Sequence, residues 1–276
     1  MKTRVISGAV IALLIVFTGY VGSYPLLAFL FVCSVIAYYE MFRALGGLQE
    51  GRKMTFPAAA AMLAVCAYYL YMGFAGTGLK ADRAFGFSLI VFVIALMLYG
   101  IIRFPGFDDR EITSAVFSFI YIPYFISFAY RARMLTHGIY IFALIFISSW
   151  ICDTCAYFTG RAFGRHKLAP HLSPKKTVEG SIGGIVGAAA ASFIASLILY
   201  FVHGENYMLL FTLAGAAGSV ISQAGDLAAS AIKRVKGIKD YGRLIPGHGG
   251  MMDRFDSVIF TAPVIYLICT LFMGIE

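Results

Sequence analysis

The hydrophobic residues of this chain form long runs that are separated by short polar segments. Each run is close to the ~20 residues that an α-helix needs to cross a hydrocarbon core of about 30 Å. Because lipid offers no partner to backbone polar groups, each run is predicted to be a helix. The nine predicted spans are residues 5–21, 25–42, 57–75, 85–102, 113–130, 139–160, 180–202, 207–231 and 255–274.

The composition strengthens this interpretation. Of the 276 residues, 60% are hydrophobic and 13% are charged, whereas soluble domains have roughly 45–50% apolar and about 25% charged residues. The first run lacks a convincing small-x-small cleavage site after it, so it is predicted to be a retained helix rather than a signal peptide. The fold class is therefore all-α, a polytopic integral membrane protein.

The basic residues predict its orientation. With the N-terminus in the cytoplasm, 18 of the 22 Lys and Arg residues fall in cytoplasmic segments, as the positive-inside rule requires. This split favours nine spans, with the C-terminus on the opposite side. The net charge of +8 then reflects orientation and phosphate-bearing partners, and no nucleic acid is expected. Only Lys80, Arg83, Arg131 and Arg133 fall on the other side.

The chain is predicted to form one membrane domain, in which the N-terminal and C-terminal halves differ in the composition of their spans. Residues 1–138 hold about five plain, aromatic-rich spans and are expected to serve packing. Residues 139–276 hold about four spans, into which polar residues and glycines enter, and are expected to carry the chemistry. Cys152 and Cys155 form a C-x-x-C without a partner pair, so small helix residues are favoured over a zinc or redox site.

A polar stripe descends the sixth span. Ser149, Asp153, Tyr157 and Arg161 recur at i+4 spacing, which places them on one helical face. An ionisable group inside a span usually faces a cavity or a charged partner. A structural ion pair between helices remains an alternative.

A basic loop follows this span and ends in Thr177, Glu179 and Gly180, which are predicted to begin the next helix. Its charges suit phosphate groups, although simple contact with anionic headgroups is an alternative. The basic residues are Arg161, Arg165, His166, Lys167, His171, Lys175 and Lys176.

A second polar stripe runs down the eighth span into the most charged segment, residues 230–256. Its members are Ser222, Asp226, Ser230 and Lys233, which share one helical face. Glycines at residues 247, 249 and 250 permit a tight turn whose N–H groups can approach an anion.

Three carboxylates near this segment suit a divalent cation with a polyphosphate. Asp253 and Asp256 are three residues apart at the start of the ninth span, and Asp226 lies on the preceding one. Mg²⁺ prefers a few carboxylates together with water and substrate phosphates, while Lys and Arg neutralise the remaining phosphate charge. A structural salt-bridge network is the alternative. His248, flanked by glycines, is a candidate ligand, acid/base or phosphate donor.

Residues 230–256, SAIKRVKGIKDYGRLIPGHGGMMDRFD, resemble the signature of the phosphatidate cytidylyltransferases, also called CDP-diacylglycerol synthases. Upstream segments are similar to other motifs of that family. These are Asp153-Thr154, Ala156-Tyr157-Phe158, Gly160-Arg161, Ser173-Pro174-Lys175-Lys176-Thr177, Glu179-Gly180 and Gly225-Asp226-Leu227. One departure is Cys155, where bacterial members are expected to have glycine, and it is expected to alter packing only.

The resemblance implies cytidylyl transfer from CTP to phosphatidate at the cytoplasmic leaflet, by a Mg²⁺-dependent homodimer. A second ion, monovalent or divalent, is an option. The short compact chain favours a bacterial inner membrane. The implied metal ligands are Asp226, Asp253 and Asp256. The implied catalytic group adds Lys233, Arg234, Lys239, Asp240 and His248. The substrate-binding residues would be Asp153, Tyr157, Arg161, Ser173, Lys175, Lys176, Thr177, Glu179, Ser230, Gly249, Gly250 and Arg254.

Two other functions stay open at this point. A CTP-dependent polyprenol kinase would need the same groups, but it would transfer the γ-phosphoryl group to a hydroxyl. An ion-coupled transporter would use Asp153 and Asp226 as ion sites within the membrane. A CDP-alcohol phosphatidyltransferase is less favoured because Ser257 and Val258 follow Asp256, where that class has the Gly of D-x-x-D-G-x-x-A-R.

Overall fold

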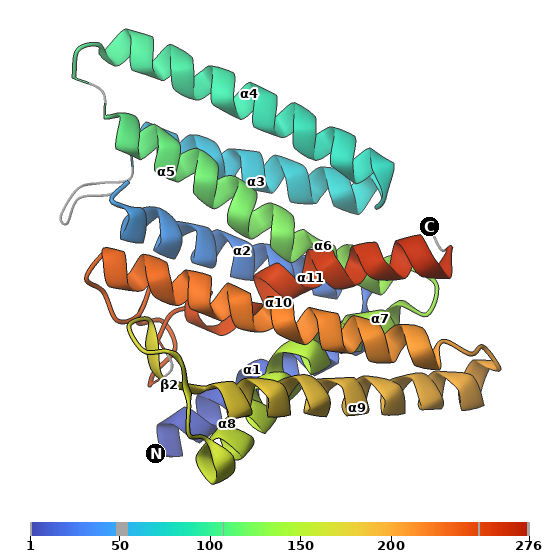
Figure 1. Ribbon diagram of the computed structural model, residues 1–276. Helices are drawn as coiled ribbons and strands as arrows, with labels where there is room; N and C mark the ends of the chain where they lie inside the picture. Colours follow the sequence, from blue (N-terminus) through green and yellow to red (C-terminus); the bar gives the residue numbers. More distant parts are fainter. Residues whose placement is uncertain (1, 48–54, 107, 248, 275–276) are drawn as a thin grey trace. The chain divides into compact units, whose positions relative to one another are not determined.

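The computed structural model describes residues 2–47, 55–106, 108–247 and 249–274. In this part of the chain, nine continuous helical segments overlap the nine predicted spans, which confirms the predicted helices (Figure 1). They are α1 (Lys2–Val21), α2 (Ser23–Leu45), α3 (Phe56–Ala75), α4 (Leu79–Arg103), α5 (Asp109–Phe119) with η1 (Ile120–Tyr124) and α6 (Phe125–Met134), α7 (Gly138–Phe146) with η2 (Ile147–Ile151) and α8 (Cys152–Phe163), α9 (Val178–His203), α10 (Met208–Val235) and α11 (Met252–Met273).

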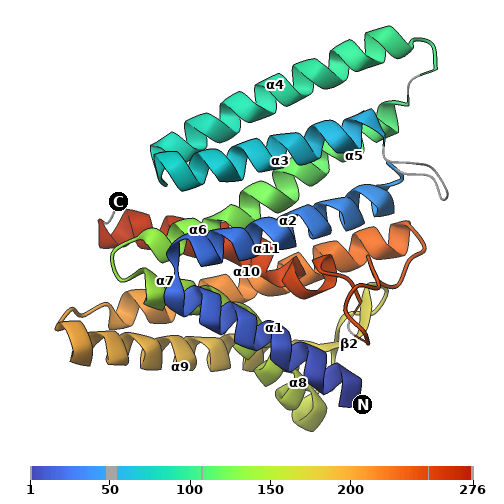
Figure 2. The same ribbon diagram turned by 180° about the vertical axis from the view of Figure 1, so that it is seen from behind.

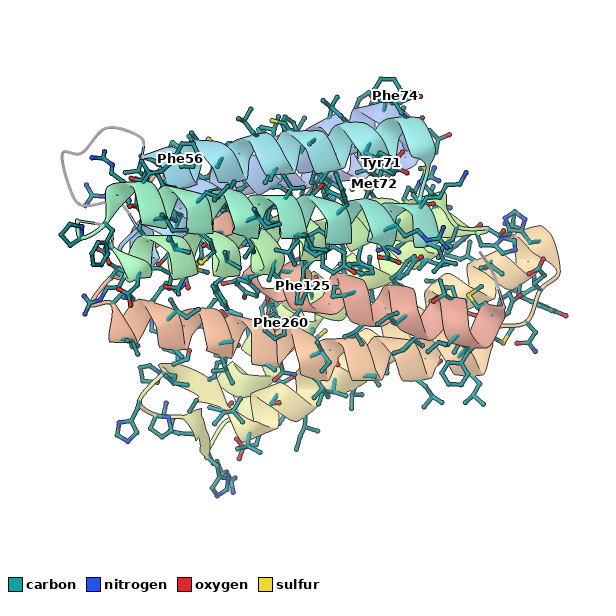
Figure 3. All side chains as sticks on the ribbon, turned by 90° about the horizontal axis from the view of Figure 1, so that it is seen from above. Phe56, Tyr71, Met72, Phe74, Phe125 and Phe260 are labelled. Carbon is teal, nitrogen blue, oxygen red and sulfur yellow. The ribbon has the colours of Figure 1, made fainter. Side chains whose placement is uncertain are left out.

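The lengths and composition of these helices are those of a polytopic membrane protein. Among the described residues, eight helices are long and apolar enough to cross a membrane, and Ser7–Val21 of α1 is a shorter apolar helix. Large apolar side chains remain exposed along the segments, as expected for a lipid-facing surface. In Figure 3, Phe74 projects outward from the end of α3, and it is 88% exposed.

Two of the spans contain a π-helical turn. Residues Ile120–Tyr124 include Pro123, whose missing N–H interrupts the regular hydrogen-bond ladder. The second turn, Ile147–Ile151, lies directly before α8 and changes the register of the predicted polar stripe. Ser149 is fully buried and donates to the Ile145 carbonyl at 2.9 Å, so it does not share the pocket face of Asp153.

The first basic loop contains a hairpin that the sequence interpretation missed. Strand β1 (Lys167–Ala169) pairs antiparallel with β2 (Ser173–Thr177), and Lys167 lies opposite Thr177. The predicted helix start after the loop is confirmed. Thr177 is the N-cap of α9, and its hydroxyl accepts the Gly180 N–H at 3.1 Å.

Two compact units make up the structure. Unit 1 is Met1–Ser127 with Ile238–Arg254, and unit 2 is Phe128–Gly237 with Phe255–Glu276. In unit 1, α3 and α4 lie side by side (Figures 1 and 2). Tyr68 and Ser127 share a buried hydrogen bond of 2.8 Å, and Ser34 and Tyr69 share one of 2.6 Å. These four hydroxyl groups therefore find partners inside an aromatic core.

Glycines allow α9 to pack closely on both α8 and α10 in unit 2 (Figures 1 and 2). A Cβ on Gly184 would lie 2.9 Å from both the carbonyl oxygen and the Sγ of Cys152. A Cβ on Gly187 would overlap Cys155. Both cysteines are free thiols that pack against glycines of α9, and their interpretation as packing residues stays a prediction.

Gly184→Ala is expected to destabilise the protein, because the new methyl group would press on α8. Overpacking of a core costs about 1–3 kcal/mol, so the Tm of the detergent-solubilised protein should fall. Gly86→Ala is the matched control, because a Cβ at Gly86 of α4 meets no atom within 4 Å. Equal Tm values for the two variants would contradict the proposed tight packing of α8 on α9.

Candidate active site

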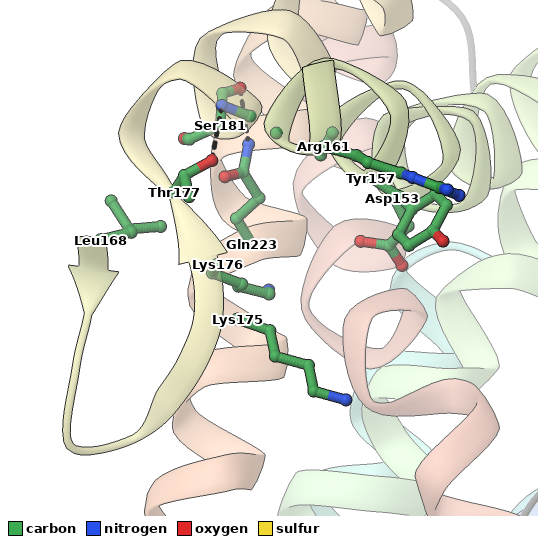
Figure 4. A pocket seen from close by; sticks show the side chains of 12 residues that line it. Asp153, Tyr157, Arg161, Leu168, Lys175, Lys176, Thr177, Ser181 and Gln223 are labelled. Atoms are coloured by element: carbon green, nitrogen blue, oxygen red, sulfur yellow. Dashed lines mark hydrogen bonds between the residues drawn. The ribbon is translucent and has the colours of Figure 1, made fainter. Parts of the chain in front are cut away.

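A pocket of about 300 Å³ opens between α8, the β-hairpin, α9 and α10 in unit 2. Asp153, Tyr157 and Arg161 line it from α8, while Lys175 and Lys176 enter from β2 (Figure 4). The sequence had assigned all five to substrate binding, and the structure places them around one cavity. The other lining residues are Ala156, Gly160, Leu168, Thr177, Gly180, Ser181 and Gln223.

An ion pair joins the hairpin to the second polar stripe. Lys176 Nζ contacts Asp226 Oδ2, and both side chains are about a quarter exposed. The pair ties β2 to α10 and leaves a cation and an anion beside the same pocket. The sequence had assigned both residues to the site but had not paired them.

Gln223 forms part of the pocket wall and was missed. Its Nε2 donates to the Ser181 carbonyl at 3.4 Å and to Cys152 Sγ at 3.5 Å. The side chain is 7% exposed and lies one turn before Asp226. Its polarity inside an apolar helix was the available signal, since buried amides normally serve a hydrogen-bond network or a site.

Asp256 lies in a strongly charged surrounding. Its side chain is 8% exposed, and Asp226, Lys233 and Asp153 all act on it electrostatically. Its Oδ1 accepts the Ser257 N–H at 2.8 Å. A glycine at residue 225 brings α10 close to this turn, because a Cβ there would lie 3.0 Å from the Asp256 carbonyl oxygen. Asp153, Asp226 and Lys233 of the two predicted stripes thus lie near Asp256 in unit 2.

The end of α10 also contacts the hairpin. Arg234 Nε donates to the Leu172 carbonyl at 3.4 Å, at the hairpin turn. Ser230, one turn earlier, and Lys233, the preceding residue, are half-buried. The two basic segments that the sequence identified therefore meet within unit 2.

Glu179 has a role in shaping the first loop. Its carboxylate accepts the backbone N–H of Arg165 at 3.0 Å and that of His166 at 3.2 Å. His166 Nδ1 lies 2.6 Å from Glu179 Oε1. The side chain thus fixes the exit of α8, and its predicted contact with substrate stays a prediction.

The loop before α11 is organised by Asp253 in unit 1. Asp253 Oδ2 accepts the N–H groups of Tyr241 at 2.8 Å and Gly250 at 3.0 Å. Gly249 has φ +84°, a conformation that favours glycine. Lys239 and Asp240 are exposed in the same loop.

The remaining predicted residues have simple placements. Ser173 is half-buried in β2, and Arg254 is half-buried in the first turn of α11. His248 lies outside the described residues.

Two carboxylates of the site could bind a divalent cation. Asp226 and Asp256 offer the oxygen ligands that Mg²⁺ prefers, and one or two carboxylates suffice when substrate phosphates complete the shell. Among the described residues, no group of three or more His, Cys, Asp or Glu side chains is arranged to hold a metal ion. The three-carboxylate set of Asp226, Asp253 and Asp256 therefore stays a prediction.

Comparison with known proteins identifies the family. The model of the cytidylyltransferase family matches residues 2–272. This chain belongs to the cytidylyltransferase family. It is 31% identical to the phosphatidate cytidylyltransferase of Bacillus subtilis over 274 residues, which is 99% of this chain and 98% of that protein. A protein of that name from Staphylococcus epidermidis is 32% identical over 270 residues, 97% of this chain and 98% of its own length.

A third relative matches the chain over a shorter region. The phosphatidate cytidylyltransferase of Thermotoga maritima is 38% identical over 170 residues, which cover 59% of this chain and 62% of that protein. The first two matches span nearly the whole chain, so membership of this cytidylyltransferase family extends to the N-terminal helices, where the sequence carried little specific signal.

Lys176→Met is expected to lower cytidylyltransferase activity at least about tenfold, equivalent to about 1.4 kcal/mol. The change leaves the Asp226 carboxylate without its cation and removes a positive charge from the pocket. The loss is measured by comparing steady-state rates of the variant and the wild type with CTP as the substrate. Lys167→Met in β1 is the control, because Lys167 is exposed and does not line the pocket. Equal activity of the two variants would argue against a role for the ion pair.

Proposed function

We propose that this protein transfers the cytidylyl group of CTP to phosphatidate and forms CDP-diacylglycerol and pyrophosphate. The observation that carries the proposal is the pocket in which Lys175, Lys176 and Arg161 gather beside Asp226. Family membership and the printed names of the full-length relatives support the cytidylyl donor and the lipid acceptor.

The positive side chains can neutralise the repulsion between the two highly anionic phosphates that this reaction must bring together. Lys175, Lys176 and Arg161 surround a cavity of about 300 Å³, which is large enough for phosphate groups. Lys233 and Arg234 add charge at the end of α10. Positioning and electrostatic neutralisation are the main contributions a protein makes to transfers of this kind.

The reaction proceeds in line and needs no covalent enzyme intermediate. A phosphate oxygen of phosphatidate attacks the α-phosphorus of CTP, a new oxygen–phosphorus bond forms, and the bond to the bridging β-phosphate oxygen breaks, so that pyrophosphate leaves. The attacking oxygen is already anionic near neutral pH, so no strong general base is required.

Mg²⁺ is the cofactor we propose, held by Asp226 and Asp256, with Asp253 as a third candidate. When bound, it would neutralise phosphate charge that the basic residues leave uncovered. A second ion, monovalent or divalent, is compatible with this set of carboxylates. His248, Lys239 and Asp240 are proposed to act with them through the loop before α11.

The orientation and the membrane location of the protein are proposed from its charge distribution and from its relatives. We propose that the site faces the cytoplasm, because 18 of the 22 Lys and Arg residues fall on that side of the predicted topology. The bacterial relatives support an inner membrane location. A homodimer is the proposed assembly.

Product analysis tests the proposal directly. Purified protein incubated with radiolabelled CTP, phosphatidate and Mg²⁺ should yield labelled CDP-diacylglycerol and pyrophosphate, and EDTA should abolish the reaction. Asp226→Asn should lower kcat/KM by about 100-fold or more, since a charged ligand is lost. Asp82→Asn of α4 is the control, because Asp82 accepts a hydrogen bond from Tyr124 in unit 1.

The competing functions give different products. CDP together with a phosphorylated lipid would identify a polyprenol kinase, and ion flux without a CTP requirement would identify a transporter. An Asp226→Asn variant with wild-type Mg²⁺-dependent activity would refute the metal assignment.

A further inference from the structure

A buried carboxylate of the N-terminal half contacts the loop that leads into α11. Glu40 lies near the end of α2 and is 6% exposed. Its Oε2 accepts the Met252 N–H at 2.8 Å, and its Oε1 accepts the Met251 N–H at 3.1 Å. A carboxylate from a helix more than 200 residues away in the sequence thus caps the start of α11.

The loop is shaped to admit this carboxylate. A Cβ on Gly250 would overlap the Glu40 carboxylate oxygens, and a Cβ on Gly242 would do the same. The Gly242 and Gly250 backbones also approach each other, since a Cβ on Gly242 would lie 3.0 Å from the Gly250 Cα. Both glycines are therefore required because a side chain at either position would collide with Glu40. Gly249 differs from them, because its positive φ alone favours glycine.

A second carboxylate fixes the same loop from within. Asp253 Oδ2 accepts the N–H groups of Tyr241 and Gly250. Met251, Met252 and Gly250 thus have their three consecutive N–H groups bound by Glu40 or Asp253. The conformation of the loop depends on both carboxylates, and Glu40 holds the turn from which Asp253 projects.

We propose that Glu40 is a positioning residue for cytidylyl transfer. Its carboxylate fixes the Gly250–Met252 backbone and so sets the orientation of Asp253 at the start of α11. The proposal rests on the proposed function, in which Asp253 is a candidate metal ligand. Glu40 itself contacts backbone amides of the loop and has no assigned contact with substrate.

Glu40→Gln tests the proposal, because the amide keeps the size of the side chain but replaces one acceptor oxygen with a donor group. In full-length protein, the Met251 and Met252 amides should exchange hydrogen faster. kcat should fall about 10- to 100-fold, the range that a small misplacement of a catalytic group causes. KM for CTP should change less than about threefold. The Mg²⁺ concentration for half-maximal rate should rise, which a smaller folded fraction would not cause.

Gly250→Ala approaches the same contact from the loop side and leaves Glu40 intact. It should reproduce the loss of kcat and the shift in Mg²⁺ dependence, because the methyl group displaces the carboxylate. Glu205→Gln is the matched acid-to-amide control, since Glu205, in the loop between α9 and α10, pairs with His137. Rates are compared per amount of monodisperse protein, well below the Tm of each variant.

The outcomes separate this proposal from the proposed function. An active wild type with unchanged kcat and Mg²⁺ dependence in Glu40→Gln would overturn the role of Glu40 alone, even if the loop amides exchange faster. A wild type that forms no CDP-diacylglycerol would reject the proposed function, and the role of Glu40 in it. Loss of kcat in both Glu40→Gln and Gly250→Ala, with Glu205→Gln unaffected, supports the proposal.

Discussion

A carboxylate inside an apolar helical protein must have its charge compensated, because transfer of an isolated ion from water is prohibitively costly. Four carboxylates at the ends of the spans meet this requirement in different ways. Asp226 pairs with Lys176, while Asp253 and Glu40 accept backbone N–H groups of the loop. Asp256 accepts one N–H and experiences the charge of Lys233. These compensations connect the segments that carry the candidate site.

Close helix packing gives the pocket its shape. Small residues on α9 allow α8 to approach, and a glycine at residue 225 lets α10 approach the first turns of α11. The hairpin then closes the remaining side, fixed by the Thr177 cap and by the Glu179 contacts to Arg165 and His166. A rigid frame of this kind holds basic side chains in place before substrate arrives, which is the condition for electrostatic catalysis.

Unit 1 joins the N-terminal helices with the loop that leads into α11. In unit 1 they enclose an aromatic core around Tyr68 and Tyr69, and α2 supplies Glu40 to the loop before α11. The match to relatives extends across nearly the whole chain and so includes this half. If Glu40 acts as proposed, a residue supports the chemistry although its own segment resembles an ordinary membrane span.

The sequence by itself determined the nine helical segments, since a hydrophobic run of membrane length has no other stable structure in lipid. It also pointed to five residues of the pocket wall, because i+4 spacing fixes a helical face and the motif spacing carries the family resemblance. They are Asp153, Tyr157, Arg161, Lys175 and Lys176. Tertiary structure alone decided the π turn that buries Ser149, the Lys176–Asp226 pair and the contact of Glu40 with Met252. The ion pair and the Glu40 contact join segments that are distant in the chain, and the π turn is a local change of helical register. The spacing of neighbouring residues encodes none of the three.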